Sequence, residues 1–244
     1  MSKRSIFFLP AILASVAISF AAQANATQFD DEAYFTVDSV EFEEVADSDA
    51  IALSDSVSDV LMNEENVCTS EDDPMSSLDE VDVALDKIIN IGRKIWTIVE
   101  KNRPVVKVTM NSANAVPDGI RSWQELEGWQ VPQVRAYSTV YKNLFGMTVV
   151  RFVYRVIYSY GGTFKGQGKY LTNVTVIPAE VHVAWGYKFD AEAQVTSVLN
   201  TGSSRNPVAA MELGVAWTVS TPVRHMHSSR GYFMTGHGDF TSLK

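Results

Sequence analysis

The stretch VHVAWGYKFDAEAQVT (residues 181–196) alternates between apolar side chains and polar or small ones over its whole length. Val181, Trp185 and Phe189 fall on one side of an extended chain, and His182 and Asp190 fall on the other. A repeat of two residues is typical of a strand that buries one face and exposes the other, as antiparallel sheets allow. We therefore predict one long, half-buried strand here.

Similar patterns extend to both sides of this stretch. Residues 209–219 are apolar at every second position, and residues 134–142 and 147–160 alternate on either side of a hairpin signal at 143–146. Shorter strands are expected at 105–110, at 170–177 before Pro178, and at 232–235, with glycine-rich or polar turns at 161–168 and 200–207. This succession predicts an antiparallel meander of six or seven strands, forming a curved sheet, a sandwich or a partly open barrel.

A different period precedes these strands. Ser77 and Glu80 have the spacing of a capping box, and apolar residues then recur in steps of three and four, including Ile88, Ile95 and Trp96. The pattern predicts an amphipathic helix over about 77–101, so the fold class expected is mainly β with an N-terminal helix (α+β). Two roles remain open for this helix: packing on the sheet, or insertion into lipid, since its second half is basic.

The chain begins with the features of a secretory signal. Lys3 and Arg4 precede an apolar run at 6–22, and Ala24-Asn25-Ala26 has the form of a cleavage site. We expect residues 1–26 to be a signal peptide and the protein to be exported, to a periplasmic or extracellular location. The chain has 1 cysteine, Cys68, so no disulfide within the chain can stabilise the exported domain, which must depend on a packed core.

Charge divides the rest of the chain. Residues 27–86 hold 20 Asp or Glu and no Lys or Arg, whereas residues 87–244 hold 18 bases and 9 acids, a balance of 18 - 9 = +9. We predict an acidic, disordered segment or pro-region at 27–76 and a basic domain at 77–244. The acidic segment is open to three interpretations: a removable pro-region, a permanent intramolecular shield of the basic domain, or a solubilising spacer.

Candidate site residues are few. The candidates for contact with a partner surface are basic and aromatic residues of the predicted strands and of the glycine-rich turn: Arg151, Arg155, Lys165, Lys169, Tyr154 and Tyr158. His225 and His227, with His237 nearby, have a spacing that can bind zinc or copper, but no cysteine accompanies them in the folded domain, and we predict no metal site. No catalytic motif is present, so we predict neither enzyme activity nor a cofactor.

These features favour an exported, non-enzymatic binding protein whose basic, aromatic-rich β-domain recognises a surface: a membrane, a glycan or another protein. An anionic surface is the expected partner, peripheral membrane contact stays open, and nucleic acid is not expected. One alternative is a pore-forming protein kept inactive by the acidic pro-segment, and another is a periplasmic structural or small-ligand-binding β-domain. The order of signal, acidic segment, amphipathic helix and basic aromatic β-domain is similar to the plan of sea-anemone pore-forming cytolysins, and this resemblance implies the pore-forming alternative.

Overall fold

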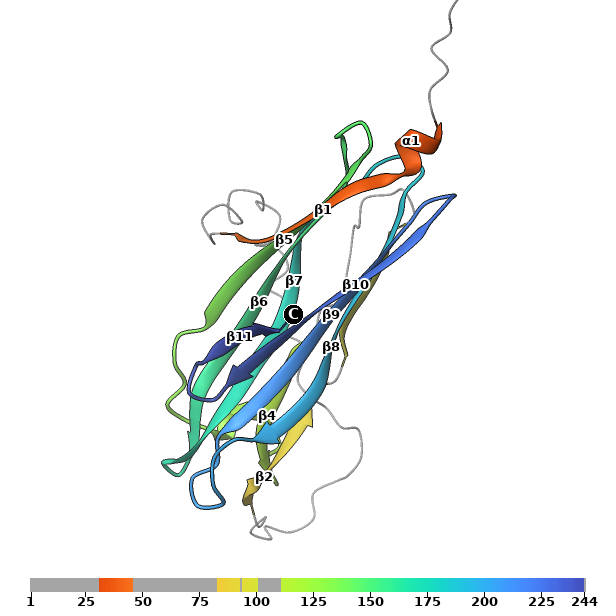
Figure 1. The fold of residues 1–244 in the computed structure, drawn as a ribbon. Coiled ribbons are helices and arrows are strands. Elements are labelled where there is room, and N and C mark those ends of the chain that lie inside the picture. Colours follow the sequence, from red (N-terminus) through yellow and green to blue (C-terminus); the bar gives the residue numbers. More distant parts are fainter. Residues whose placement is uncertain (1–30, 46–82, 93, 101–110, 244) are drawn as a thin grey trace, which may run out of the picture. The chain divides into compact units, whose positions relative to one another are not determined.

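The computed structural model describes residues 31–45, 83–92, 94–100 and 111–243. Within them the fold is mainly β and consists of two antiparallel sheets (Figure 1). Sheet A contains, in spatial order, β1 (Val37–Val45), β5 (Gln133–Asn143), β6 (Thr148–Phe164), β7 (Gln167–Val183), β4 (Ala113–Asp118) and β2 (Ala84–Ile91). Sheet B contains β11 (Phe240–Leu243), β10 (His225–Thr235), β9 (Ala209–Ser220), β8 (Lys188–Asn200) and β3 (Lys94–Glu100). The helical elements are α1 (Asp31–Phe35) and a short 3-10 helix, η1 (Trp123–Glu125).

The two sheets share one hydrophobic core and do not close into a barrel. Each sheet ends in its own edge strands, β1 and β2 in sheet A and β11 and β3 in sheet B. The core draws large side chains from both sheets, and the rings of Phe152 on β6 and Trp217 on β9 lie 5.9 Å apart. Packing of two apolar sheet faces against each other is what removes these side chains from water.

Several predicted strands are confirmed. Every second residue from Ala209 to Val219 is buried, as the alternation predicts. β5 and β6 cover the expected strands at 134–142 and 147–160, and the amide of Gly146 donates to the carbonyl of Asn143 in the turn between them. The short last strand expected at 232–235 is the end of the longer β10, and β11 follows it.

The long strand expected at 181–196 is wrong in one respect, because it is two strands in different sheets. β7 ends at Val183, a turn with Gly186 at φ 80° follows, and β8 begins at Lys188. The prediction that Trp185 faces inward fails with it, since Trp185 is 77% exposed. Only glycine readily adopts a positive φ, which lets the chain leave sheet A and enter sheet B within four residues.

Pro178 does not end its strand. β7 continues to Val183, and the pairing of β6 with β7 shifts register beside Tyr154, which lies opposite Pro178. A proline lacks the amide that the ladder needs, and a bulge is one of the few places in a sheet where it fits.

The helix predicted at about 77–101 is wrong wherever the structure describes it. Residues 84–91 form β2 and residues 94–100 form β3, so Ile88, Ile95 and Trp96 lie on strands. β-Branched side chains fill this stretch and favour extended backbone, and Gly92 has a φ of 88°, which a right-handed helix cannot contain. Ile95 and Trp96 are nevertheless buried in the core, at 0% and 2% exposed.

Part of the acidic segment is also folded. Residues 31–45 form α1 and β1, and β1 pairs with β5 along its length. Phe42 stacks on Tyr137 with ring centroids 5.7 Å apart, and the Arg230 guanidinium of sheet B lies 4.1 Å from the Phe42 ring centroid. The prediction of disorder is therefore wrong for these residues. The signal peptide predicted at 1–26, the remainder of the acidic segment and the strand at 105–110 lie outside the described residues.

Buried aromatic side chains join the two sheets through their polar atoms. The hydroxyls of Tyr154 on β6 and Tyr232 on β10 lie 2.6 Å apart. The indole of Trp217 on β9 donates to the Tyr141 hydroxyl on β5 at 2.8 Å, and the indole of Trp96 on β3 donates to a carbonyl of β7. A buried donor without an acceptor costs free energy, so these bonds favour one alignment of the sheets.

We expect Gly92→Ala to destabilise the fold strongly. A methyl group at residue 92 would collide with the Ser112 carbonyl oxygen, in addition to the cost of about 1–2 kcal/mol for an alanine at positive φ. Gly166→Ala is the matched control, because Gly166 has a φ of 77° but nothing within 4 Å of the added methyl. Urea unfolding of both variants measures the difference, and equal losses would contradict the collision.

We also expect stability to fall at alkaline pH. Burial raises the pKa of Tyr154 and Tyr232 above the ordinary value. Burial raises the pKa of four further tyrosines to about 12: Tyr137, Tyr158, Tyr170 and Tyr187. Tyrosines of the unfolded chain ionise near pH 10, so above that pH the unfolded state loses protons that the folded state keeps, and the free energy of unfolding declines as pH rises. Urea unfolding between pH 7 and pH 12 measures this decline. Tyrosinate absorbance that develops fully near pH 10 while the protein stays folded would contradict it.

Candidate functional site

Exposed apolar side chains gather at one end of the two sheets. The described residues include nine large hydrophobic side chains that are exposed, and five of these lie on turns at this end. We call the five the apolar end: Leu144, Phe145 and Met147 on the β5–β6 turn, Trp185 on the β7–β8 turn and Val223 on the β9–β10 turn. Figure 1 shows the β5–β6 turn beside α1 and the β9–β10 turn at the same end of the strands. Contiguous exposed apolar groups on a folded protein indicate an interaction surface.

The pairing of the strands places these three turns together. The Ala184 amide donates to the Val149 carbonyl at 2.8 Å, which joins the β7–β8 turn to the start of β6. Lys188, the first residue of β8, pairs with Ser220, the last residue of β9, so the β9–β10 turn projects from the same end. The pairing of the strands thus fixes where these turns project.

Helix α1 supports the apolar end from within. The Tyr34 hydroxyl donates to the Trp185 carbonyl at 3.1 Å, and the Phe35 and Trp185 rings lie 6.3 Å apart. The Leu144 amide donates to the carbonyl of Thr36, the residue after α1, at 3.1 Å, which ties the β5–β6 turn to the end of this helix. Tyr187 lies beneath these rings, and burial raises its pKa to about 12. A rigid base of this kind holds Trp185 and Leu144 outward.

Charged residues of both signs surround the apolar end. Lys188 and Arg224 are exposed beside it, on β8 and on the β9–β10 turn. Asp31 and Glu32 are exposed on α1. The apolar end therefore has no strong net charge, and its distinguishing feature is its exposed apolar side chains.

The structure separates the basic candidates of the sequence. Arg151 is exposed on β6, and its Nε lies 3.7 Å from a Glu180 oxygen. Arg155 is only 9% exposed. Lys165 lies on the β6–β7 turn, at the opposite end of β6 from the apolar end, and Lys169 lies near it on β7. These four residues do not form one basic patch.

The aromatic candidates are in the core. Tyr154 and Tyr158 are 0% and 1% exposed, and their hydroxyls bond to Tyr232 and to the Gly238 carbonyl. Alternation places both on the inner face of sheet A, so a partner surface cannot reach them. Trp185, which the sequence placed inside, is instead 77% exposed.

The histidines do not meet. His225 and His227 lie on β10 and their Nδ1 atoms bond to Ser220 and Thr218, at 2.9 and 3.2 Å. His237 follows the other end of β10. Among the residues that the structure describes, no three His, Cys, Asp or Glu side chains are grouped so that they could hold a metal ion.

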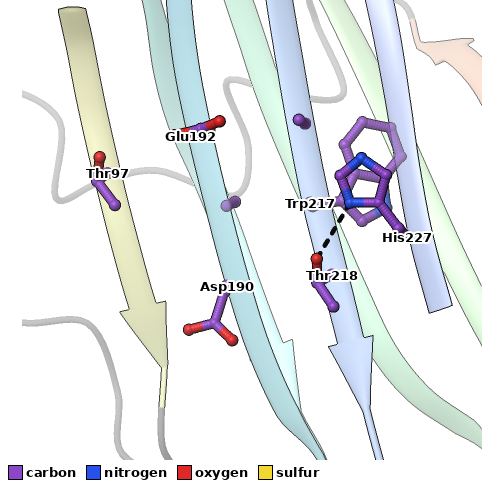
Figure 2. Close-up of a pocket in the computed structure, with 8 residues that line it drawn as sticks. Thr97, Asp190, Glu192, Trp217, Thr218 and His227 are labelled. Carbon is purple, nitrogen blue, oxygen red and sulfur yellow. Dashed lines mark hydrogen bonds between the residues drawn. The ribbon is translucent and has the colours of Figure 1, made fainter. Parts of the chain in front are cut away.

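A shallow hollow lies on the outer face of sheet B. Eight residues line it: Thr97, Asp190, Ala191, Glu192, Ala216, Trp217, Thr218 and His227. Figure 2 shows Asp190 and Glu192 on β8, between Thr97 on β3 and Thr218 on β9, with His227 bonded to Thr218. Two carboxylates and an imidazole can hydrogen-bond a polar molecule, but an open hollow leaves such a ligand in contact with water. It therefore offers weaker support for a binding function than the apolar end.

Sequence reasoning missed the apolar end because the exposure of a turn residue depends on where the strands stop. One signal was present: Leu144 and Phe145 interrupt the hairpin turn 143–146, where polar residues are usual. Trp185 gave no such signal, since it continued the alternation of the strand expected at 181–196.

Within the described residues, no helix has the length and apolar character needed to cross a membrane. The comparisons with known proteins found no family model that matches the chain. They also found no match among curated proteins and none among solved structures.

Proposed function

We propose that this chain is an exported, non-enzymatic binding protein that attaches to lipid surfaces through its apolar end. The observation that carries the proposal is the exposure of Trp185 at 77%, Val223 at 61% and Leu144 at 54% on three turns at the same end. Turn residues that project from a rigid base can enter the boundary between lipid headgroups and acyl chains without unfolding of the sheets. Tryptophan is especially suited to this boundary, because its ring is apolar and its N–H is polar.

The free energy gained by burying these apolar side chains in lipid is sufficient for reversible attachment. Full burial of a large apolar side chain contributes about 1.5–3 kcal/mol, and a Kd of 1 mM corresponds to about 4 kcal/mol. A few partly inserted side chains therefore support binding that is weak but measurable. Lys188 and Arg224 lie beside the apolar end and can contact lipid phosphates, but the exposed Asp31 and Glu32 offset their charge, so apolar contact supplies most of the binding.

This proposal shifts the expected balance of forces from charge to apolar contact. The fold brings the six acidic residues of 31–45 into the same body as the basic strands, and two of them pair with bases of β5: Glu41 with Lys142 at 2.7 Å and Glu44 with Arg135 at 3.3 Å. The binding proposed here depends only weakly on salt.

The pore-forming alternative has lost its main support. It required a helix over residues 78–101 that leaves the β-domain, and residues 84–91 and 94–100 pair as strands with β4 and β8. The expectation of a periplasmic or extracellular location remains part of the proposal, and its basis is the signal sequence at 1–26.

We expect Trp185→Ser to weaken vesicle binding about tenfold, since the loss of one inserted aromatic removes roughly 1.4 kcal/mol. The triple variant Leu144→Ser, Trp185→Ser, Val223→Ser is expected to abolish binding. Cosedimentation with vesicles of phosphatidylcholine, with and without phosphatidylglycerol, measures both at low and high salt.

Val131→Ser is the matched control for these variants. Val131 is 82% exposed but precedes β5, at the end of the strand opposite the β5–β6 turn, and its substitution is expected to leave binding unchanged. Failure of the unmodified protein to bind either vesicle, or full binding by the triple variant, would refute the proposal.

A further inference from the structure

Three turns meet at the end of the strands opposite the apolar end. We call them the distal turns: the β6–β7 turn at 165–166, the β8–β9 loop at 201–208 and the β10–β11 turn at 236–239. Figure 1 shows the first two at the end of the strands away from the β9–β10 turn. The Lys169 amide donates to the Pro207 carbonyl at 2.9 Å, which joins the start of β7 to the β8–β9 loop. The Gly236 amide donates to the Ala209 carbonyl at 2.7 Å, which brings the β10–β11 turn to the other end of that loop.

Each distal turn exposes one basic side chain. The three exposed residues are Lys165, Arg205 and His237, and half-buried Lys169 follows the first turn. Within the part of the chain that the structure describes, neither lysine forms an ion pair, and Arg205 forms none. The distal turns contain one acid, Asp239, and its carboxylate accepts a hydrogen bond from the Thr235 hydroxyl at 2.9 Å. The balance of charge on these turns is therefore positive.

Lys165 holds its position in an unfavourable backbone conformation. Lys165 and Gly166 have φ values of 50° and 77° and form a two-residue turn between the paired residues Phe164 and Gln167. Such a turn requires positive φ at both central residues, and Asn, Asp or Gly is usual at the first. The Lys165 Nζ lies 5.3 Å from the Phe164 ring centroid, a cation–π contact. A strained backbone beneath an exposed cation indicates that this side chain serves a contact outside the fold.

The β8–β9 loop presents Arg205 from a rigid frame. The Asn200 Oδ1 accepts two backbone amides of the loop, at 2.9 and 3.0 Å. The Ser203 amide donates to the Asn206 carbonyl, and the Asn206 amide donates to the Ser203 hydroxyl, both at 3.1 Å. Arg205 lies inside this closed turn, so binding of a ligand there does not have to order the loop first.

An indole pair flanks the distal turns. Glu127 exchanges two backbone hydrogen bonds with Thr163, at 3.0 and 2.8 Å, close to the β6–β7 turn. Trp129 covers Gly162, where an added methyl group would collide with the indole ring. Trp123 packs edge-on against Trp129 at 6.5 Å and is 36% exposed. The exposed Glu127 carboxylate lies on this side, so a bound anion is expected at the turns and an apolar ring face at the indole.

We propose that the distal turns bind an acidic polysaccharide. Lys165, Lys169 and Arg205 contact its sulfate or carboxylate groups, and Trp123 packs against a sugar ring. The whole chain has a net charge of -9, so general attraction to polyanions does not account for such binding. The site is independent of the lipid attachment proposed for the apolar end, and together the two ends would hold a lipid surface and a polysaccharide at once.

Calorimetric titration of the full mature protein tests the ligand class. Dextran sulfate and polygalacturonate are expected to bind, with affinity that falls as salt rises, whereas neutral dextran is expected not to bind. Absence of binding to both anionic polymers at low salt would overturn the proposal. Equal affinity for single-stranded DNA of matched charge would overturn its assignment to polysaccharide.

Paired variants test the site. Lys165→Asn with Arg205→Gln is expected to weaken binding of dextran sulfate about tenfold or more. Asparagine suits the turn at residue 165, so Lys165→Asn alone is expected to raise the melting temperature, which separates loss of binding from loss of the fold. Lys94→Gln with Arg151→Gln removes one exposed lysine and one exposed arginine elsewhere and is expected to retain binding. Equal losses in the two double variants would contradict a site at the distal turns.

A further comparison separates the two ends of the molecule. Trp123→Ser is expected to weaken polysaccharide binding and to leave vesicle binding unchanged. The triple variant Leu144→Ser, Trp185→Ser, Val223→Ser is expected to retain full polysaccharide binding. Unchanged affinity of Trp123→Ser would refute the contact with a sugar ring, and loss of polysaccharide binding in the triple variant would refute the independence of the two sites.

Discussion

The alignment of the two sheets depends on hydrogen bonds that buried tyrosine hydroxyls and tryptophan indole N–H groups make from one sheet to the other. Packing of apolar side chains alone tolerates small slides of one sheet over another, whereas a hydroxyl or indole N–H in the core must meet its acceptor. Tyr154 with Tyr232, Trp217 with Tyr141, and Trp96 with a carbonyl of β7 each join one sheet to the other. Together they fix where β9, β10 and β3 lie against β5, β6 and β7. The turns at the apolar end are positioned as a consequence.

This alignment gives different parts of the surface different tasks. The strand ends carry apolar side chains outward on turns that the sheets position, and edge strand β1 pairs its acids with bases of β5. The outer face of sheet B stays polar and open to water, with a shallow hollow at Asp190 and Glu192. Because the exposed turns lie apart from the packed faces of the sheets, substitutions on the turns can change the surface without disturbing the core.

The strands of the meander could be predicted from the sequence where apolar and polar residues alternate without interruption. The prediction failed where one spacing of apolar residues is compatible with both a helix and strands. Residues 209–219 were predicted correctly because every second side chain enters the core.

Apolar residues in steps of three and four over residues 78–98 fit a helix but also fit two strands joined at Gly92, and the spacing alone could not distinguish the helix from the strands. β1 was missed because its acids suggested self-repulsion, while the bases that neutralise Glu41 and Glu44 lie about a hundred residues later. Trp185 was misplaced because nothing local marks the change of sheet apart from one glycine. The apolar end depends on all of these and could not be assembled from the sequence.

The long separation between β1 and its partner β5 also has a kinetic consequence. Val37 pairs with Asn143 and Val45 with Ala136, so this edge can close only after the intervening chain has been synthesised and β5 has joined β6. Contacts so distant in sequence carry a high loop-closure entropy and form late in folding. During that interval, β5 is the exposed edge of sheet A, with free amides and carbonyls that another chain could pair with. Pairing of the N-terminal strand with β5 covers the edge that β5 would otherwise expose, so loss of β1 is expected to leave a strand edge open to association with another chain.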